Sequence, residues 1–147
     1  MKIIIINGPN LNLLGKRDRK IYGDLSLEGI SFTIKKEFSK NKFVFFQSNL
    51  EGEIVNQIQH ATKNFDGLII NPGGYAHTSV AIRDALADSN IPKIEVHLSN
   101  LNSREDFRQI LLTASACNGY VSGFRENSYN AAVYLLQKII NKKKRKN

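Results

Sequence analysis

Three apolar runs in this chain end abruptly in clusters of small and polar residues. The runs and the clusters that follow them are Ile3–Ile6 with Asn7–Asn10, Leu68–Ile70 with Asn71–His77, and Ile94–Val96 with His97–Asn100. If the runs are parallel strands, all three clusters lie at the carboxyl ends of those strands, where open α/β sheets bind their ligands. The pattern therefore predicts one crevice that gathers amides, two histidines and a hydroxyl group.

The spacing of apolar residues alternates along the chain between strand-like and helix-like periods. Strands are predicted at about 2–7, 43–46, 66–71, from 92 onward and near 119–123, and helices at about 27–40, 51–63, from 78 or 79 to 89, 104–111 and 127–141. Ser26 is the predicted N-cap of the first helix. The last helix is expected to use an apolar stripe made of Ala131, Ala132, Leu135, Leu136 and Ile139.

Strands that are apolar almost throughout and alternate with helices predict an α/β fold with a parallel sheet. Right-handed crossovers leave few topologies. We expect a flavodoxin-like five-stranded parallel sheet, strand order 2-1-3-4-5, with helices on both faces and its switch point between the first and third strands. One catalytic domain is predicted over residues 1–141, followed by a basic C-terminal tail, residues 142–147, that is expected to be disordered.

The composition is that of a globular protein, with 147 residues, 41% of them apolar and 23% charged. No apolar stretch approaches the roughly 18 residues that a membrane span needs. The first apolar run has four residues and meets Asn-Gly-Pro at once, which does not fit a signal peptide. A single cysteine, Cys117, excludes an internal disulfide framework and suits a reducing cytoplasm, which is the expected location.

The net charge of +8 raises the question of a nucleic-acid partner. Five of the 21 basic residues lie in 142–146, and without them 16 basic residues face 13 acidic ones. The excess charge therefore belongs to a solvated tail, and no nucleic-acid or membrane partner is predicted. Contact of the tail with polyanions is the rival interpretation.

Several kinds of site lack their characteristic spacing. The three histidines, His60, His77 and His97, show no pattern of a zinc site, so no metal is predicted. The glycine-rich nucleotide loops and the Gly-x-Ser-x-Gly elbow are absent as well. Asn7 and Asn71 stand where phospho-accepting switch proteins of this fold carry acidic residues.

Proton transfer remains as the chemistry that the polar clusters allow. Glu95 lies two residues before His97, so both side chains point to one face of the predicted strand. A carboxylate beside an imidazole fixes its tautomer and favours the protonated form that a general acid requires. A satisfied histidine at the end of a strand is the alternative.

The loop after the first strand holds Arg17, Arg19 and Tyr22. A free tyrosine, with a pKa of about 10, is ionised to only about one part in a thousand at pH 7. An arginine within ~4–6 Å can lower the pKa of an ionisable group by about 1–3, which would make a tyrosinate base feasible. A packing role for the tyrosine is the other interpretation of the same residues.

Taken together, these motifs resemble the type II 3-dehydroquinate dehydratases over almost the whole chain, to about residue 140. The matching segments are Asn7–Gly15, Arg17, Tyr22–Gly23, Gln47–Asn49 with Glu51–Gly52, Asn71–Ser79, Ile82–Ala85, Glu95–Asn100 and Arg104–Arg108. The resemblance implies a lyase of the shikimate pathway, which leads to chorismate and the aromatic amino acids. Its reaction would be the trans-dehydration of 3-dehydroquinate to 3-dehydroshikimate through an enolate, with no Schiff base, metal or cofactor.

The resemblance also assigns catalytic roles. Tyr22 matches the base that takes the proton next to the ketone, and Arg17 matches the arginine that favours its tyrosinate form. His97 matches the acid that protonates the departing hydroxyl, with Glu95 as its partner. Asn10 matches a loop asparagine that holds a water or the enolate oxygen.

Substrate contacts follow from the resemblance in the same way. Leu98 and Ser99 would bind the substrate carboxylate, and Asn71, His77 and Arg108 would hold its hydroxyls. Asp84 matches a residue that reaches the site of a neighbouring subunit, because the family forms trimers assembled into dodecamers. The expected partners are therefore a small-molecule substrate and further copies of this chain.

Two positions depart from the family pattern. Leu50 stands where many members have histidine, and Arg125 stands where glycine is common. Arg125 could alter a subunit contact or the packing of a loop. A flavodoxin-like binder of flavin or another phosphate-bearing ligand is the alternative to the dehydratase.

Overall fold

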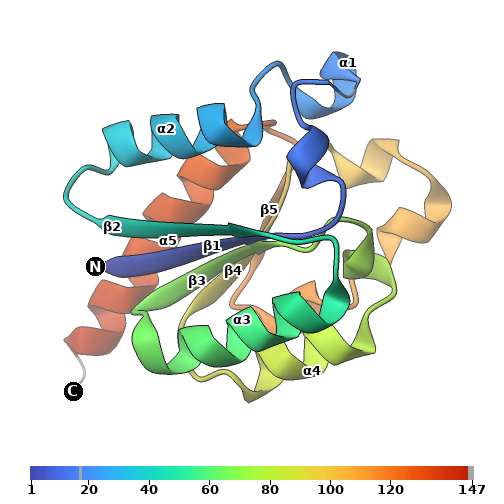
Figure 1. The fold of residues 1–147 in the computed structure, drawn as a ribbon. Coiled ribbons are helices and arrows are strands. Elements are labelled where there is room, and N and C mark those ends of the chain that lie inside the picture. Colours follow the sequence, from blue (N-terminus) through green and yellow to red (C-terminus); the bar gives the residue numbers. More distant parts are fainter. Residues whose placement is uncertain (17, 146–147) are drawn as a thin grey trace.

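The computed structural model describes residues 1–16 and 18–145 of the chain. Five strands form one sheet in the order β2-β1-β3-β4-β5, and every neighbouring pair is parallel (Figure 1). The strands are β1 Lys2–Asn7, β2 Lys42–Gln47, β3 Gly67–Asn71, β4 Lys93–His97 and β5 Tyr120–Ser122. The predicted strand order and α/β fold class are confirmed.

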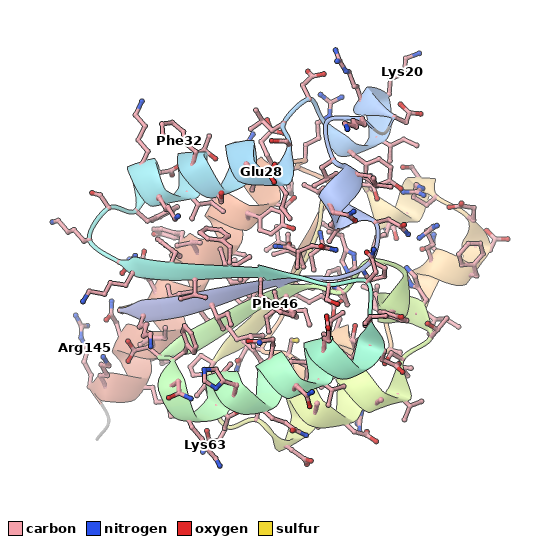
Figure 2. All side chains as sticks on the ribbon, in the orientation of Figure 1. Lys20, Glu28, Phe32, Phe46, Lys63 and Arg145 are labelled. Carbon is pink, nitrogen blue, oxygen red and sulfur yellow. The ribbon has the colours of Figure 1, made fainter. Side chains whose placement is uncertain are left out.

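Two layers of helices enclose the sheet (Figure 1). The helices are α1 Arg19–Tyr22, α2 Leu27–Glu37, α3 Glu51–Asn64, α4 Val80–Asp88 and α5 Asn127–Lys144. Helices α2 and α5 pack on Ile3 and Ile5 of β1, whereas α3 and α4 pack on Ile4 and Ile6, the alternate side chains of the same strand. Figure 2 shows Phe32 and Lys63 pointing outward from the two opposite layers.

Short 3₁₀ turns replace regular helix in the connections near the carboxyl ends of the strands. They are η1 Leu11–Leu13, η2 Gly73–His77, η3 Leu101–Ser103, η4 Asp106–Gln109 and η5 Ala114–Ala116. The helix predicted over 104–111 is therefore wrong in type and length: the structure has the four-residue turn η4 there. Arg108 of this turn lines the site described below.

Helices α2 and α5 both end at residues other than those predicted. Ser26 caps α2 as predicted, accepting a hydrogen bond from the Gly29 amide, but α2 ends at Glu37. Helix α5 continues through Lys144, three residues beyond the predicted end at 141, so the basic segment begins as helix. Lysines are good helix formers, and their charge is favourable at the carboxyl end of a helix.

The face that α5 buries is also shifted from the predicted stripe. The buried apolar residues are Tyr129, Ala132, Val133, Leu136 and Ile140, whereas Leu135 is 44% exposed. Their spacing follows one helical face at i, i+3, i+4, i+7 and i+11. Nine of the 18 residues of this helix are apolar, so periodicity alone did not single out the buried face.

The sheet register brings the polar clusters to one edge. Asn7 of β1 pairs with Asn71 of β3, so these two strands end side by side. Ile70 pairs with Glu95 of β4, and His97 follows two residues later on the same face. The connections after β1, β3 and β4 therefore open onto a common crevice, as predicted for a sheet of this order. Among the described residues, no helix combines the length and apolarity needed to cross a bilayer.

The turns after β1 and β3 approach each other closely at Gly8. Its amide donates to the Asn71 carbonyl at 2.8 Å, and a Cβ placed on Gly8 would lie 2.4 Å from the Pro72 carbonyl oxygen. A side chain at this position would have to push the two turns apart. Gly8 therefore sets the spacing of two walls of the crevice.

We predict that Gly8→Ala lowers the free energy of unfolding by about 1–3 kcal/mol, because backbone atoms must move to admit the methyl group. Gly52→Ala is the matched control, since nothing lies within 4 Å of its added Cβ. In the helix α3 that substitution should be neutral or stabilising by less than about 1 kcal/mol. Urea unfolding of both variants measures the difference, and equal stabilities would contradict the role given to Gly8.

Candidate active site

A cavity of about 120 Å³ lies at the carboxyl ends of β1, β3 and β4. Its lining residues are Pro9, Asn10, Leu11, Tyr22, Asn71, Gly73, Gly74, His77, His97, Leu98, Ser99, Arg104 and Arg108. Most of the site residues predicted from the sequence are therefore brought together. Glu95 lies directly behind His97, Asp84 is not part of the lining, and Arg17 lies outside the described residues.

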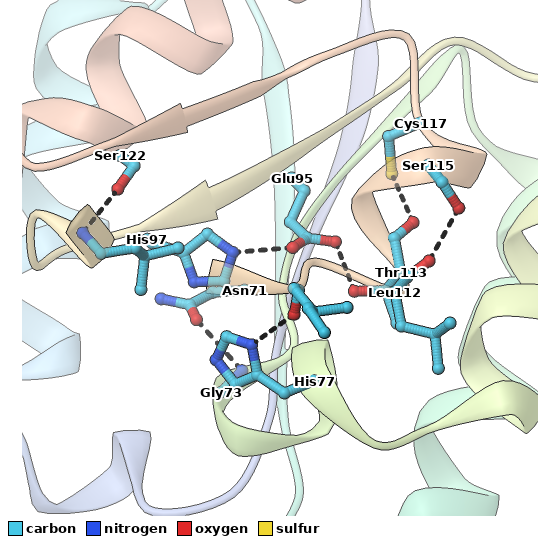
Figure 3. Close-up of polar contacts among 12 residues, drawn as sticks. Asn71, Gly73, His77, Glu95, His97, Leu112, Thr113, Ser115, Cys117 and Ser122 are labelled. Atoms are coloured by element: carbon cyan, nitrogen blue, oxygen red, sulfur yellow. Dashed lines mark hydrogen bonds and ion pairs between the residues drawn. The ribbon is translucent and has the colours of Figure 1, made fainter. Parts of the chain in front are cut away.

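A buried hydrogen bond joins Glu95 to His97, and His97 lines the cavity (Figure 3). Glu95 is 0% exposed and its Oε1 accepts a hydrogen bond from His97 Nε2 at 2.7 Å. The other carboxylate oxygen, Oε2, accepts from Thr113 Oγ1 at 2.6 Å. With Nε2 committed to the carboxylate, Nδ1 is the nitrogen of His97 available for proton exchange with a ligand. The contact predicted from the two-residue spacing is confirmed.

His77 lies in the turn η2 after β3, and a backbone carbonyl holds its ring. Its Nδ1 lies 2.8 Å from the carbonyl oxygen of Ile110, which can only accept, so Nδ1 carries the proton. Its ring stacks on that of His97 with centroids 6.4 Å apart. Nε2 is then the His77 atom that can accept a hydrogen bond from a ligand hydroxyl.

A buried chain of hydrogen bonds orients Asn71. Asn71 Nδ2 donates to the Tyr129 hydroxyl at 3.0 Å, and that hydroxyl donates to Asn7 Oδ1 at 2.6 Å. The Gly73 amide donates to Asn71 Oδ1 at 3.2 Å. Burial raises the pKa of Tyr129, so its hydroxyl stays protonated and fixes the two asparagines.

Asn10 lines the cavity and has a left-handed backbone conformation, with φ of 66°. Its amide donates to Asn49 Oδ1 at 3.0 Å, and the same oxygen accepts from Gln47 Nε2 at 3.1 Å. Asparagine tolerates this conformation better than most residues with a side chain. The segment after β2 thus supports the loop that carries Asn10.

Arg104 joins Tyr22 to Ser99, a link that was not predicted. Its Nη1 donates to the Tyr22 hydroxyl at 3.3 Å and to Ser99 Oγ at 3.1 Å. The guanidinium carbon also lies 5.5 Å from the centroid of the Tyr22 ring. A cation so placed stabilises negative charge on the phenol oxygen. Arg104 was noted in the sequence only as part of a motif, because a predicted helix gave no reason to turn it toward Tyr22.

Glu105 organises the two arginines of this wall. Its Oε2 accepts from Arg104 Nε at 3.2 Å and from Arg108 Nε at 2.8 Å. A hydrogen bond from its own backbone amide, together with Arg108, lowers the pKa of Glu105 to about 2. The exposed carboxylate is therefore ionised at neutral pH and holds both guanidinium groups beside the cavity.

Asp84, which was predicted to bind substrate, and the single cysteine, Cys117, do not line the cavity. Asp84 is exposed on α4 and pairs with Arg83 at 3.0 Å. Burial, with a smaller contribution from the charge of Glu95, raises the pKa of the Cys117 thiol to about 12, so this cysteine is protonated at neutral pH. Within residues 1–16 and 18–145, no three His, Cys, Asp or Glu side chains are grouped to hold a metal ion.

Fold and site together define a flavodoxin-like α/β protein whose cavity is lined by an imidazole hydrogen-bonded to a buried carboxyl group and by a tyrosine beside a guanidinium. Residues 1–137 match the sequence profile of the family described as Dehydroquinase class II. The chain belongs to this family.

Known relatives agree in sequence and in structure. A 3-dehydroquinate dehydratase of Fusobacterium nucleatum subsp. nucleatum is 51% identical over 147 residues, covering 97% of this chain and 100% of the relative. One of Clostridium beijerinckii is 51% identical over 140 residues, covering 93% and 96% of the two chains. The crystal structure of a type II dehydroquinase from Butyrivibrio crossotus superposes with a TM-score of 0.90 at 48% identity, covering 93% of this chain and 97% of the other.

Proposed function

We propose that this protein is a type II 3-dehydroquinate dehydratase that eliminates water from 3-dehydroquinate to give 3-dehydroshikimate in the shikimate pathway. The observation that carries the proposal is the placement of Tyr22 and the His97–Glu95 pair around one cavity. A base and an acid in one pocket are what an elimination of water requires. Family membership and the named relatives support the same activity and do not favour the flavodoxin-like ligand binder.

In the proposed reaction, Tyr22 as tyrosinate removes the proton next to the ketone, and an enolate forms. Arg104, at 3.3 Å from the phenol oxygen, stabilises the tyrosinate before the transfer, and Arg17 supplies a further positive charge by its family match. Asn10 holds a water or the enolate oxygen. Fixed donors aimed at developing negative charge are an effective source of catalysis.

Departure of the hydroxyl completes the elimination. The Nδ1 proton of His97 passes to the leaving hydroxyl, which leaves as water, and the pair of electrons of the enolate forms the conjugated double bond. Glu95 stabilises the imidazolium that donates this proton. Because the carboxylate is fully buried, its interaction with the imidazolium is weakly screened by solvent.

The substrate is oriented by the remaining residues of the cavity. Leu98 and Ser99 bind its carboxylate through backbone amides and a hydroxyl. Asn71, His77 and Arg108 hold its ring hydroxyls. Arg104 already bonds Ser99 Oγ at 3.1 Å, so it adds positive charge where the substrate carboxylate would lie. No lysine is among the described lining residues, which favours an enolate over a Schiff base.

We also propose that the enzyme is cytoplasmic and forms a dodecamer of four trimers, in which Asp84 reaches the site of a neighbouring subunit. Exposed apolar side chains support assembly: Phe107, Ile110, Tyr120 and Phe124 are each more than half exposed. Tyr120 and Phe124 line a hollow of about 380 Å³ that adjoins the site at Arg108. Exposed apolar groups of this kind mark contacts between proteins.

The activity is tested by adding 3-dehydroquinate to the purified protein and following the ultraviolet absorption of the conjugated enone product. We expect product to appear without added metal or cofactor, and borohydride in the presence of substrate to leave the activity intact. Tyr22→Phe and Arg17→Gln should lower kcat at least ~100-fold while the fold survives, because general-base catalysis contributes about 10²–10⁴-fold.

Tyr134→Phe is the matched control for the tyrosine, because Tyr134 is 53% exposed on α5, away from the cavity. It should retain native turnover. The proposal fails if the native protein gives no enone, and Tyr22 loses its role as base if Tyr22→Phe turns over as fast as Tyr134→Phe.

Arg104→Gln should lower kcat about 10- to 100-fold, because a charged hydrogen bond to the phenol oxygen is lost. Arg19→Gln is the control: Arg19 belongs to the same helix as Tyr22, but its exposed guanidinium pairs with Asp24 at 3.7 Å. We expect that control to stay within about twofold of native kcat, as surface ion pairs contribute little. Steady-state kinetics give kcat for both variants. An equal loss of kcat in the two would show that Arg104 contributes only a general positive charge and not a specific hydrogen bond to Tyr22.

A further inference from the structure

The segment 110–113, between η4 and η5, contacts the acid–base groups from outside the cavity. None of its residues lines the cavity around His97. Its backbone is anchored to η2, where the Ala76 carbonyl accepts from the amides of Leu112 and Thr113 at 2.8 and 3.3 Å. The segment is thereby attached to the turn that carries His77.

Two hydrogen bonds connect this segment to the histidines, one directly to His77 and the other through Glu95 to His97. The Ile110 carbonyl accepts from His77 Nδ1, and the Thr113 hydroxyl donates to Glu95 Oε2, whose carboxylate holds His97 (Figure 3). The first bond fixes the tautomer of His77. The second acts on His97 through Glu95.

The bond from Thr113 matters because Glu95 has no contact with solvent. Thr113 is itself 0% exposed, and its Oγ1 lies 2.6 Å from Oε2. A buried carboxylate is stable only when its oxygens are matched by donors. His97 satisfies Oε1, so removal of the Thr113 hydroxyl would leave Oε2 buried without a described donor. Glu95 could then rotate or take up a proton, and in either case it would hold the imidazolium less well.

We infer that Thr113 is a positioning residue for the acid of the reaction: its hydroxyl fixes the Glu95 carboxylate so that His97 presents Nδ1 to the substrate. This role rests on the dehydratase activity proposed above. Thr113 touches neither the cavity nor the substrate, so its effect should fall on turnover rather than on substrate binding.

The test compares Thr113→Val, which replaces the hydroxyl by a methyl group of similar size, with Thr113→Ser, which keeps the hydroxyl. Thr113→Val should lower kcat roughly 10- to 100-fold with KM within about twofold, because a buried bond to a charged group is lost. Thr113→Ser should retain at least about half of the native kcat. Thr62→Val is the control: it removes a hydroxyl that bonds Ser89 Oγ at 2.9 Å between α3 and the end of α4, and kcat should be unchanged.

A double-mutant cycle separates positioning from general damage to the fold. In a Glu95→Gln background, Thr113→Val should cause less than about a twofold further loss, because the charge that the hydroxyl stabilises is absent. If Thr113→Val does not fold, Thr113→Ala and Thr113→Ser, which differ by one oxygen atom, provide the same comparison. The inference would be overturned if Thr113→Val kept the native kcat, or if Thr113→Ser lost as much kcat as Thr113→Val. It would also be overturned if Thr113→Val lowered kcat by the same factor in the Glu95→Gln background as in the native protein. A native protein without dehydratase activity would instead contradict the function itself.

Discussion

The buried contact between Glu95 and His97 is the interaction on which the rest of this structure depends. Strand β4 is covered on both faces, and a carboxylate with no exposure to solvent is costly there unless donors surround it. His97 and Thr113 provide those donors at 2.7 and 2.6 Å. The fold therefore holds a hydrogen-bonded carboxyl group inside its core, and the same group fixes the ring of His97, the residue proposed above as the acid.

The other elements of the site are arranged around that pair by the parallel sheet. Register places Asn71 of β3 beside Asn7 of β1, and the close approach at Gly8 sets the spacing of the turns that follow. The Tyr129 hydroxyl, brought by α5 from the end of the chain, fixes both asparagines. Contacts between distant parts of the sequence thus leave the cavity residues few alternative conformations, which is the preorganisation that electrostatic catalysis needs.

Local periodicity explains which features could be predicted from the sequence. A period of two places Glu95 and His97 on one face of a strand, and apolar runs ending in polar clusters predict the sheet and its order. The contacts of Arg104 and Thr113 escaped prediction because a helix was expected over 104–111 and no element was predicted for 112–118, whereas the chain forms 3₁₀ turns and loop there. Their partners, Tyr22 and Glu95, are far away in sequence, so only the folded chain reveals the contacts. The hydrogen bond between His77 and Ile110 uses a backbone carbonyl, so the identity of residue 110 gives no hint of it in the sequence.

The tautomer of His97 tests the central claim most directly. Nuclear magnetic resonance of protein labelled with ¹⁵N in histidine distinguishes the two ring nitrogens and reports which one carries a proton. We predict that Nε2 remains protonated across the working pH range, while Nδ1 is the nitrogen whose signal changes as the ring titrates. An Nε2 signal of an unprotonated nitrogen in the native protein would contradict the account, because His97 would then not donate to Glu95.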